Sequence, residues 1–345
     1  MNIPLTAAGL LPPAKPAKTW LVPLITLLAM GVLPMLLSEY AQDLAVKIII
    51  YAIFALSLEL LVGTTGLISL GHAAFFGIAA YVTALTVPDT GAGSILLMLP
   101  AAMLGAGCYA LFVGALSLRT RGVYFIMVTL AFAQMAFFVF HDTGIGGGSD
   151  GIYLSSRPAL SVAGITLVDL ELPRHFFFFA LGSLAATYLL LALIQRSRFG
   201  RALAGIRTNE QRMRAAGYRT YGYKLAAFVI AGMLAGLAGF LMAARTGVVN
   251  PELLSWHESG AVLLMIILGG LGSLRGAVLG AVAFILLKEF YSSEAIFAGF
   301  AKHWQMSLGI SMILFVAFLP HGLIGLGRPG AWRRKPRTAK GVSHG

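Results

Sequence analysis

Residues 94–118, SILLMLPAAMLGAGCYALFVGALSL, decide the fold because they form one continuous apolar segment without a charged side chain. A helix rises about 1.5 Å per residue, so about 20 such residues cross the hydrocarbon core of a bilayer. Similar segments occur at residues 20–37, 176–194 and 307–318. Because they are continuous and do not alternate with polar residues, they exclude a transmembrane barrel and predict membrane-spanning helices.

The composition of the whole chain supports this prediction. Of its 345 residues, 58% are hydrophobic and 11% are charged, and the mean hydropathy is +0.86. Soluble domains carry about 25% charged residues, which is more than twice the share found here. We therefore predict an all-α polytopic membrane protein with about 10 transmembrane helices. The expected spans are residues 20–37, 45–62, 67–87, 94–118, 123–140, 176–194, 225–244, 259–270, 277–290 and 307–319.

The distribution of charge predicts the orientation of these spans. The formal net charge is +12, and most of the 25 Lys and Arg residues fall on alternate connections between spans and in the two tails. Most acidic residues fall on the opposite connections. Because cytoplasmic loops are enriched in Lys and Arg, the basic side and both termini are predicted to be cytoplasmic. The positive charge therefore reflects membrane topology and argues against nucleic-acid binding.

The spans divide the chain into three regions. Residues 1–19 form a cytoplasmic N-terminal tail, residues 20–326 a transmembrane domain, and residues 327–345 a basic cytoplasmic C-terminal tail. Two connections inside the transmembrane domain are long. Residues 141–175 lie on the outer side and are rich in glycine at their start, and residues 195–224 lie on the inner side and are strongly basic.

The inner connection carries an amphipathic pattern. Leu203, Ile206, Met213 and Ala216 recur at helical spacing, with arginines between them. Two interpretations fit this pattern. The segment either lies on anionic lipid at the membrane surface or docks on a cytoplasmic partner.

Residues 66–77, GLISLGHAAFFG, place flexible and polar residues at the start of an apolar helix. Gly66 and Gly71 flank the Ser69 hydroxyl, and the His72 imidazole follows. Polar residues at membrane depth usually face a bundle interior or an aqueous cavity, and interrupted helices there expose backbone groups that suit a zwitterion. A His72 that is satisfied by a neighbouring carbonyl is an equally good interpretation.

The motif has a later counterpart. GLISL at residues 66–70 and GLGSL at residues 270–274 both precede helices rich in small residues. The similarity is consistent with a possible two-half internal repeat, as in many transporters. Chance similarity in a chain rich in Gly, Ala and Leu explains it equally well.

Several motifs in order resemble the permease subunits of branched-chain amino-acid ATP-binding-cassette (ABC) importers. The resemblance covers residues 51–326, and RGVYF at 121–125, VTLAFAQM at 128–135 and GGSDG at 147–151 resemble the LivM type. The other motifs are residues 66–81, SRFGRAL at 197–203, IRTNE at 206–210, KLAAF at 224–228, AGLAG at 235–239, LGGLGSLRG at 268–276 and LPHGLIGL at 319–326.

The resemblance implies a location in the bacterial inner (plasma) membrane and a set of partners. These are a sister permease subunit, two cytoplasmic ATPase subunits, a periplasmic substrate-binding protein and membrane lipid. It also implies that residues 141–175 are a periplasmic loop and residues 195–224 a cytoplasmic coupling loop. The residues expected to couple to the ATPase are Arg201, Arg207, Asn209 and Glu210. The residues expected in the substrate pathway are Gly66, Ser69, Gly71, His72, Thr129 and Gln134.

Other features argue against catalysis by this chain. It has no Gly-x-x-x-x-Gly-Lys-Ser/Thr segment to cradle ATP phosphates, so we expect no cofactor here and ATP on partner subunits. Its seven histidines are scattered, so we expect neither a metal site nor a catalytic residue.

Two alternative functions remain open. An ion-coupled secondary transporter would need an acid within the membrane, and Glu59 is the acid well inside a span. Urea and amide permeases resemble the same family, so the substrate stays open between branched-chain amino acids, a broader amino-acid range and urea.

Overall fold

The computed structural model describes residues 38–88, 93–162, 165–293, 297, 302–319 and 322–327. The expected N-terminal tail, the expected span at residues 20–37, and residues 328–345 of the expected C-terminal tail lie outside these ranges. A helix coincides with each expected span from residues 45–62 onward. These helices are α2 (Glu39–Glu59), α3 (His72–Thr86), α4 (Ile95–Ser117), α5 (Val123–Asp142), α6 (Pro173–Arg196), α9 (Thr220–Thr246), α10 (Trp256–Gly269), α11 (Leu274–Ser292) and α13 (Trp304–Phe318).

Within the described ranges, 6 helices are long and apolar enough to cross a membrane. The number rises to 7 if α10 and α11 are counted as one span that bends by 116° at the break between them. The polytopic all-α class is therefore confirmed. The span predicted at residues 67–87 begins later than expected, because α3 starts at His72 and has only 15 residues.

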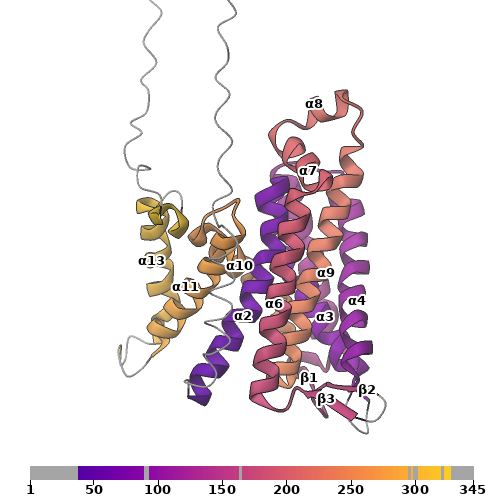
Figure 1. Ribbon diagram of the computed structural model, residues 1–345, viewed down its shortest axis with the longest axis vertical. Coiled ribbons are helices and arrows are strands. Elements are labelled where there is room, and N and C mark those ends of the chain that lie inside the picture. The colour runs from indigo at the N-terminus through magenta and orange to yellow at the C-terminus, as the bar shows by residue number, and fades with distance from the viewer. Residues whose placement is uncertain are drawn as a thin grey trace, which may run out of the picture.

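Helix α2 lies at the centre of the molecule. It continues as the π-helix η2 (Leu60–Thr65), and within this combined segment 89% of the most apolar window is buried. It packs against α6 and α9 on one side and against α10 and α11 on the other. Figure 1 shows α10, α11 and α13 on one side of α2 and the bundle that contains α3, α4, α6 and α9 on the other.

The two long connections lie at opposite ends of the bundle (Figure 1). The inner connection folds into α7 (Arg198–Thr208) and α8 (Glu210–Ala215). The outer connection contains three short strands. Strand β2 (Ala159–Val162) pairs with β3 (Ile165–Asp169), and β1 (Ile152–Tyr153) pairs with β4 (Val248–Val249), which follows α9; both pairs are antiparallel. Strand structure in the described residues is thus confined to loops.

Glycines allow α9 to approach its neighbours at backbone distance. A Cβ atom on Gly239 would lie 2.0 Å from the carbonyl oxygen of Phe76 on α3, and one on Gly232 would lie 2.4 Å from the Ala110 Cβ on α4. Such distances leave no room for a methyl group. Lipid tails are as apolar as the side chains of the helices, so helices in a membrane associate through close packing and not through the hydrophobic effect. Small residues make that close packing possible.

We expect the substitution Gly239→Ala to destabilise the bundle, because the added methyl group would force α9 away from α3. Overpacking costs about 1–3 kcal/mol, which outweighs the gain of about 1 kcal/mol in helix propensity. Thermal unfolding in detergent should show a lower midpoint for this variant. The matched control is Gly182→Ala on α6, where nothing lies within 4 Å of the added Cβ. Equal midpoints for the two variants would contradict the close approach.

Candidate functional site: substrate path and coupling surface

The segment between α2 and α3 interrupts the helical structure, and within it Ser69 and Gly71 are buried whereas Gly66 and Ile68 are exposed. The π-helix η2 ends at Gly66, whose φ of 74° lies in the left-handed region that favours glycine. Residues 67–71 are not helical, and the Ser69 side chain is fully buried and accepts a hydrogen bond from the backbone amide of Gly71 (3.2 Å). A Cβ on Gly71 would lie 2.2 Å from the carbonyl oxygen of Thr129. The interruption therefore packs directly against the backbone of α5.

His72 is fully buried at the first position of α3. Its Nε2 atom lies 2.8 Å from the Ser57 hydroxyl on α2, and that hydroxyl donates its proton to the Phe54 carbonyl (2.7 Å). Because a hydroxyl has one proton, we assign His72 the tautomer in which Nε2–H donates to Ser57. The ring also stacks on Phe54 with centroids 5.5 Å apart. The hydrogen-bond partner of the imidazole is therefore the Ser57 hydroxyl, whereas one interpretation of the sequence was a neighbouring carbonyl.

A side chain from α10 caps the start of α3. The Ser259 hydroxyl accepts a hydrogen bond from the backbone amide of Ala73 (2.9 Å) and is fully buried. The first turn of any helix has amide groups without intrahelical partners, and a side-chain oxygen satisfies one of them here. Sequence reasoning missed both Ser57 and Ser259, since a single serine in an apolar helix carries no local signal.

The six residues expected in the substrate pathway do not all lie together. Gly71 packs on Thr129, whose own hydroxyl donates to the Ile126 carbonyl (3.0 Å), and Ser69 and His72 are buried on either side of Gly71 in the sequence. Gln134 is half-buried on α5 and, at about 100° per residue, points about 140° away from Thr129 around the helix. Gly66 lies at the coupling end, where a Cβ would be 3.2 Å from the Arg207 Cγ.

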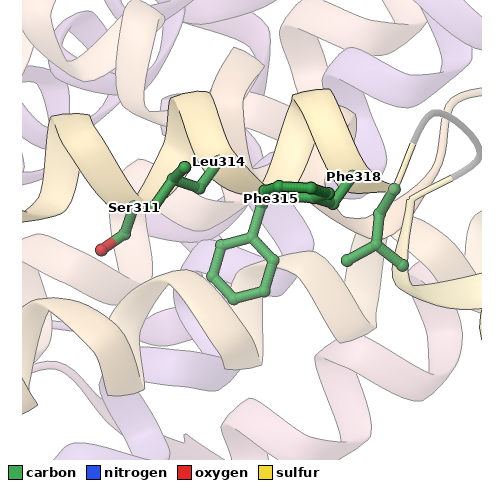
Figure 2. Close-up of a pocket in the computed structure, with 5 residues that line it drawn as sticks. Ser311, Leu314, Phe315 and Phe318 are labelled. Atoms are coloured by element: carbon green, nitrogen blue, oxygen red, sulfur yellow. The ribbon is translucent and has the colours of Figure 1, made fainter.

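A separate apolar pocket lies on α13 (Figure 2). It is lined by Ser311, Leu314, Phe315, Phe318 and Leu319. The Ser311 hydroxyl is already engaged by the Tyr291 hydroxyl (2.6 Å). None of the residues expected in the substrate pathway lines this pocket, so it has no part in the candidate path.

The inner connection contains two helices where the sequence pattern suggested one amphipathic segment. Ser197 caps α7 by accepting from the Gly200 amide (3.2 Å), and Asn209 caps α8 by accepting from the Arg212 amide (2.9 Å). Leu203 and Ile206 on α7 are buried, as their spacing predicts. The chain turns at Asn209 because its extended backbone ends α7 while its side chain starts α8.

Glu210 holds the inner connection together. Its carboxylate accepts from Lys224 (2.6 Å), Arg214 (2.6 Å) and Thr220 (3.1 Å). Burial by itself would raise the pKa of Glu210, but the hydrogen bonds and charges of these partners outweigh it and lower the pKa to about 2. Glu210 is therefore ionised and ties α8 to the start of α9.

The two arginines expected to couple to the ATPase have different partners within the chain. Arg201 donates to the Arg196 carbonyl (2.8 Å), which keeps it on the α6–α7 corner. Arg207 crosses to the membrane domain and donates to the Gly63 carbonyl in η2. Of the four expected coupling residues, Asn209 and Glu210 thus build the loop, and Arg207 joins it to the helices.

Ionisable residues on α2 also connect the two sides of the molecule at the outer end. The Arg245 Nε lies 2.9 Å from an Asp43 oxygen, the Tyr40 hydroxyl donates to Glu289, and the Tyr51 hydroxyl donates to Glu258 (3.0 Å). These partners come from α9, α11 and α10. The sequence shows these residues but not their pairing, because each pair is more than 200 positions apart.

A polytopic helical bundle with buried polar groups at a helix interruption is typical of membrane transport subunits. Comparison with known proteins identifies the kind. The family model described as branched-chain amino acid transport system / permease component matches residues 40–319. This chain belongs to that family, so it is the permease subunit of an ABC importer in the inner membrane and not an enzyme.

Individual relatives agree with this assignment. The high-affinity branched-chain amino acid transport system permease protein LivM of Escherichia coli (strain K12) is 33% identical over 92% of this chain and 78% of its own length. LivM of Salmonella typhimurium is 33% identical over 89% of this chain and 75% of its own length. The xylose transport system permease protein XylH of Escherichia coli (strain K12) is 34% identical over only 28% of this chain and 27% of its own length. The resemblance to the LivM type is confirmed.

We expect the coupling loop to loosen in acid because of Glu210. Its folded pKa of about 2 lies below the ordinary value of 4.5, so the stabilisation is complete above pH 4.5 and is lost as the pH falls toward 2. Hydrogen exchange of the α8 amides, corrected for its intrinsic pH dependence, should therefore rise over that range. The variant Glu210→Gln should show the faster exchange already at pH 7. The control Glu252→Gln, in the segment between α9 and α10, should leave α8 unchanged, and identical profiles for native protein and Glu210→Gln would contradict the assignment.

Proposed function

We propose that this chain forms one half of the translocation path of an ATP-driven importer for branched-chain amino acids. The observation that carries the proposal is the helix interruption before α3, where Ser69, Gly71 and His72 are buried in an otherwise apolar bundle and Gly71 packs on α5. Ser69, Gly71, His72 and Thr129 form its centre, with Gly66 at the inner end and Gln134 further along α5. A few hydroxyl and imidazole groups among apolar walls suit a zwitterion with an aliphatic side chain.

The proposed topology has ten spans and both termini in the cytoplasm. It adds residues 20–37 to the helices of the described ranges and counts α3, α10 and α11 separately. Residues 1–19 and 327–345 are then inner tails around the transmembrane domain 20–326, and residues 141–175 face the periplasm. The charge distribution supports this arrangement.

The proposed assembly has one sister permease, two ATPase subunits that hydrolyse ATP, and a periplasmic binding protein that delivers the substrate. Residues 195–224 are the coupling loop, with Arg201, Arg207, Asn209 and Glu210 as its key residues. The names of the LivM relatives support the amino-acid substrate, and the family supports the ATPase partners.

The test is uptake by the complete complex, co-expressed with its partner subunits and binding protein and reconstituted into liposomes. Labelled leucine should enter only when ATP is supplied to the ATPase side, and collapse of the proton gradient should have no effect. Urea uptake in place of leucine uptake would identify the alternative substrate class. Uptake driven by a proton gradient without ATP would exclude the ABC mechanism.

We expect the substitution Gly71→Leu to abolish uptake while the complex still assembles. The Cβ of a leucine at residue 71 would lie 2.2 Å from the Thr129 carbonyl oxygen, so the branched side chain must push α3 away from α5. Leucine uptake by reconstituted complex is the measurement, and Gly182→Leu, at an open position on α6, is the matched control. Unimpaired uptake by Gly71→Leu would remove residues 66–77 from the pathway.

We expect the combined change of Arg201, Arg207 and Glu210 to glutamine to uncouple transport from ATP hydrolysis. The loop would lose its internal ties through Glu210 and its bond from Arg207 to η2, together with two arginines expected to couple to the ATPase, although the membrane helices remain. Substrate-stimulated ATP hydrolysis should fall to the unstimulated rate, while membrane insertion persists. Normal stimulation in this triple variant would refute the assignment of residues 195–224.

A further inference from the structure

Helices α3 and α10 are both too short to cross a membrane alone. They have 15 and 14 residues, whereas about 20 are needed. The start of α3 bonds to Ser57 and the start of α10 bonds to Tyr51, and both partners lie well inside the segment that α2 and η2 form together (residues 39–65). The first turns of α3 and α10 therefore lie away from the membrane surface, and other helices must hold them in place.

The two first turns are joined to each other by a hydrogen bond. The backbone amide of Ala73 in α3 donates to the Ser259 hydroxyl of α10 (2.9 Å), and Ser259 is fully buried. Just before α10, the 3₁₀ turn η5 (Pro251–Leu254) also packs on α3, where a Cβ on Gly77 would lie 2.4 Å from the Leu254 Cγ. The start of α10 thus fixes the backbone that directly follows the helix interruption.

Glu258 ties the same turn of α10 to α2. Its carboxylate accepts a hydrogen bond from the hydroxyl of Tyr51 (3.0 Å), and Tyr51 is buried. Consecutive residues of a helix point about 100° apart, so Glu258 and Ser259 reach two different helices from one turn. Within the described residues, Ser255 makes no side-chain capping bond to this turn, and Trp256 is exposed. The bond from Tyr51 to Glu258 is therefore what holds this turn against α2.

The later part of α10 is fixed by a different contact. A Cβ on Gly280 of α11 would lie 1.8 Å from the Met265 carbonyl oxygen, so the two helices pack there at backbone distance. Met265 lies about 9 Å further along α10 than Ser259. The first turn of a helix has amides without intrahelical partners, and helix ends fray. The contact with α11 therefore leaves the first turn of α10 dependent on its own ties to α2 and α3.

We propose that Tyr51 and Glu258 are positioning residues of the substrate path. Their hydrogen bond holds the first turn of α10 where Ser259 caps α3, and the capped turn fixes the backbone at the start of α3. The inference rests on the proposed path through residues 66–72. Without the bond, the first turn of α10 moves away from α3, the Ala73 amide loses its acceptor, and the path loses its fixed width. Tyr51 and Glu258 act on the path through Ser259 and do not touch the substrate.

Hydrogen–deuterium exchange of residues 70–76 in the complete complex measures this tie directly. Tyr51→Phe removes only a hydroxyl and should raise exchange at the start of α3 about fivefold, the size expected for loss of one hydrogen bond. Ser259→Ala removes the acceptor of the Ala73 amide and should have the same effect. The double variant Tyr51→Phe/Ser259→Ala should exchange no faster than Ser259→Ala, because both changes act on the same bond.

Substitutions of Glu258 provide a rescue. Glu258→Gln keeps an oxygen that accepts from Tyr51, so exchange at the start of α3 should stay near the native rate. Glu258→Leu has no acceptor and should match Tyr51→Phe. The matched control is Tyr40→Phe, which removes a hydroxyl that α2 donates to Glu289 of α11 at the outer end and should leave the start of α3 unchanged.

The consequence for transport is measured as leucine transported per ATP hydrolysed by the complete complex in liposomes. Tyr51→Phe and Glu258→Leu should lower this ratio about fivefold, in step with the loss of the hydrogen bond. Glu258→Gln and Tyr40→Phe should keep the native ratio. A tie with no part in the path would change exchange but not this ratio, and that outcome would overturn the proposal.

Three other results would also overturn it. These are native exchange at the start of α3 in Tyr51→Phe, a further increase in the double variant, and an equal effect of Tyr40→Phe. If Glu258→Leu does not insert, Tyr51→Phe and Glu258→Gln decide the question. Failure of the proposed function has a different signature, since the native complex would then show no ATP-dependent leucine uptake while exchange would still report the tie between α2, α10 and α3.

Discussion

Backbone that is not helical persists at membrane depth only where protein groups satisfy its amides and carbonyls. Within residues 67–71, the Gly71 amide donates to the Ser69 hydroxyl and the Leu67 amide donates to the Leu61 carbonyl. Just after the interruption, Ser259 of α10 accepts from the Ala73 amide, and Ser57 of α2 holds the His72 side chain. Gly71 lets α5 approach at backbone distance. The start of α3 is therefore held by α2, α5 and α10 together.

The second interruption meets the same constraint by a different route. Gly270 leaves α10 with a φ of 115°, and Ser273 caps α11 by accepting from the Gly276 amide (3.1 Å). The helices can turn back on each other because glycines line the contact: a Cβ on Gly269 would lie 1.8 Å from the Gly276 carbonyl oxygen. The similar motifs GLISL and GLGSL therefore occupy similar positions, each between two helices. A shared position is what an internal repeat requires, although chance similarity would leave the same pattern.

Hydropathy predicts the helices well because each span must cover the hydrocarbon with apolar side chains, and α4 and α5 begin within one residue of their expected positions. Hydropathy fails at residues 67–71, because Leu67 and Leu70 are as apolar as residues of a membrane helix. The interruption begins at Gly66, whose positive φ is seen only in the structure. The turn at Asn209 carried a readable capping signal, since Asn favours the position before a helix. The contacts of Ser259 with α3 and of Arg207 with η2 depend on residues more than 100 positions apart, which no local pattern encodes.

The charges of residues 195–224 fall into two groups. Glu210 accepts from Lys224 and Arg214, so these ion pairs fix α8 to the start of α9. Other arginines on α7 and α8 are exposed and give this end of the molecule a positive charge. If residues 195–224 dock on an ATPase subunit, as proposed, a rigid connection would pass on the movement of that partner, whereas a flexible one would absorb it. On that proposal, the internal ion pairs matter for coupling as much as the exposed arginines do.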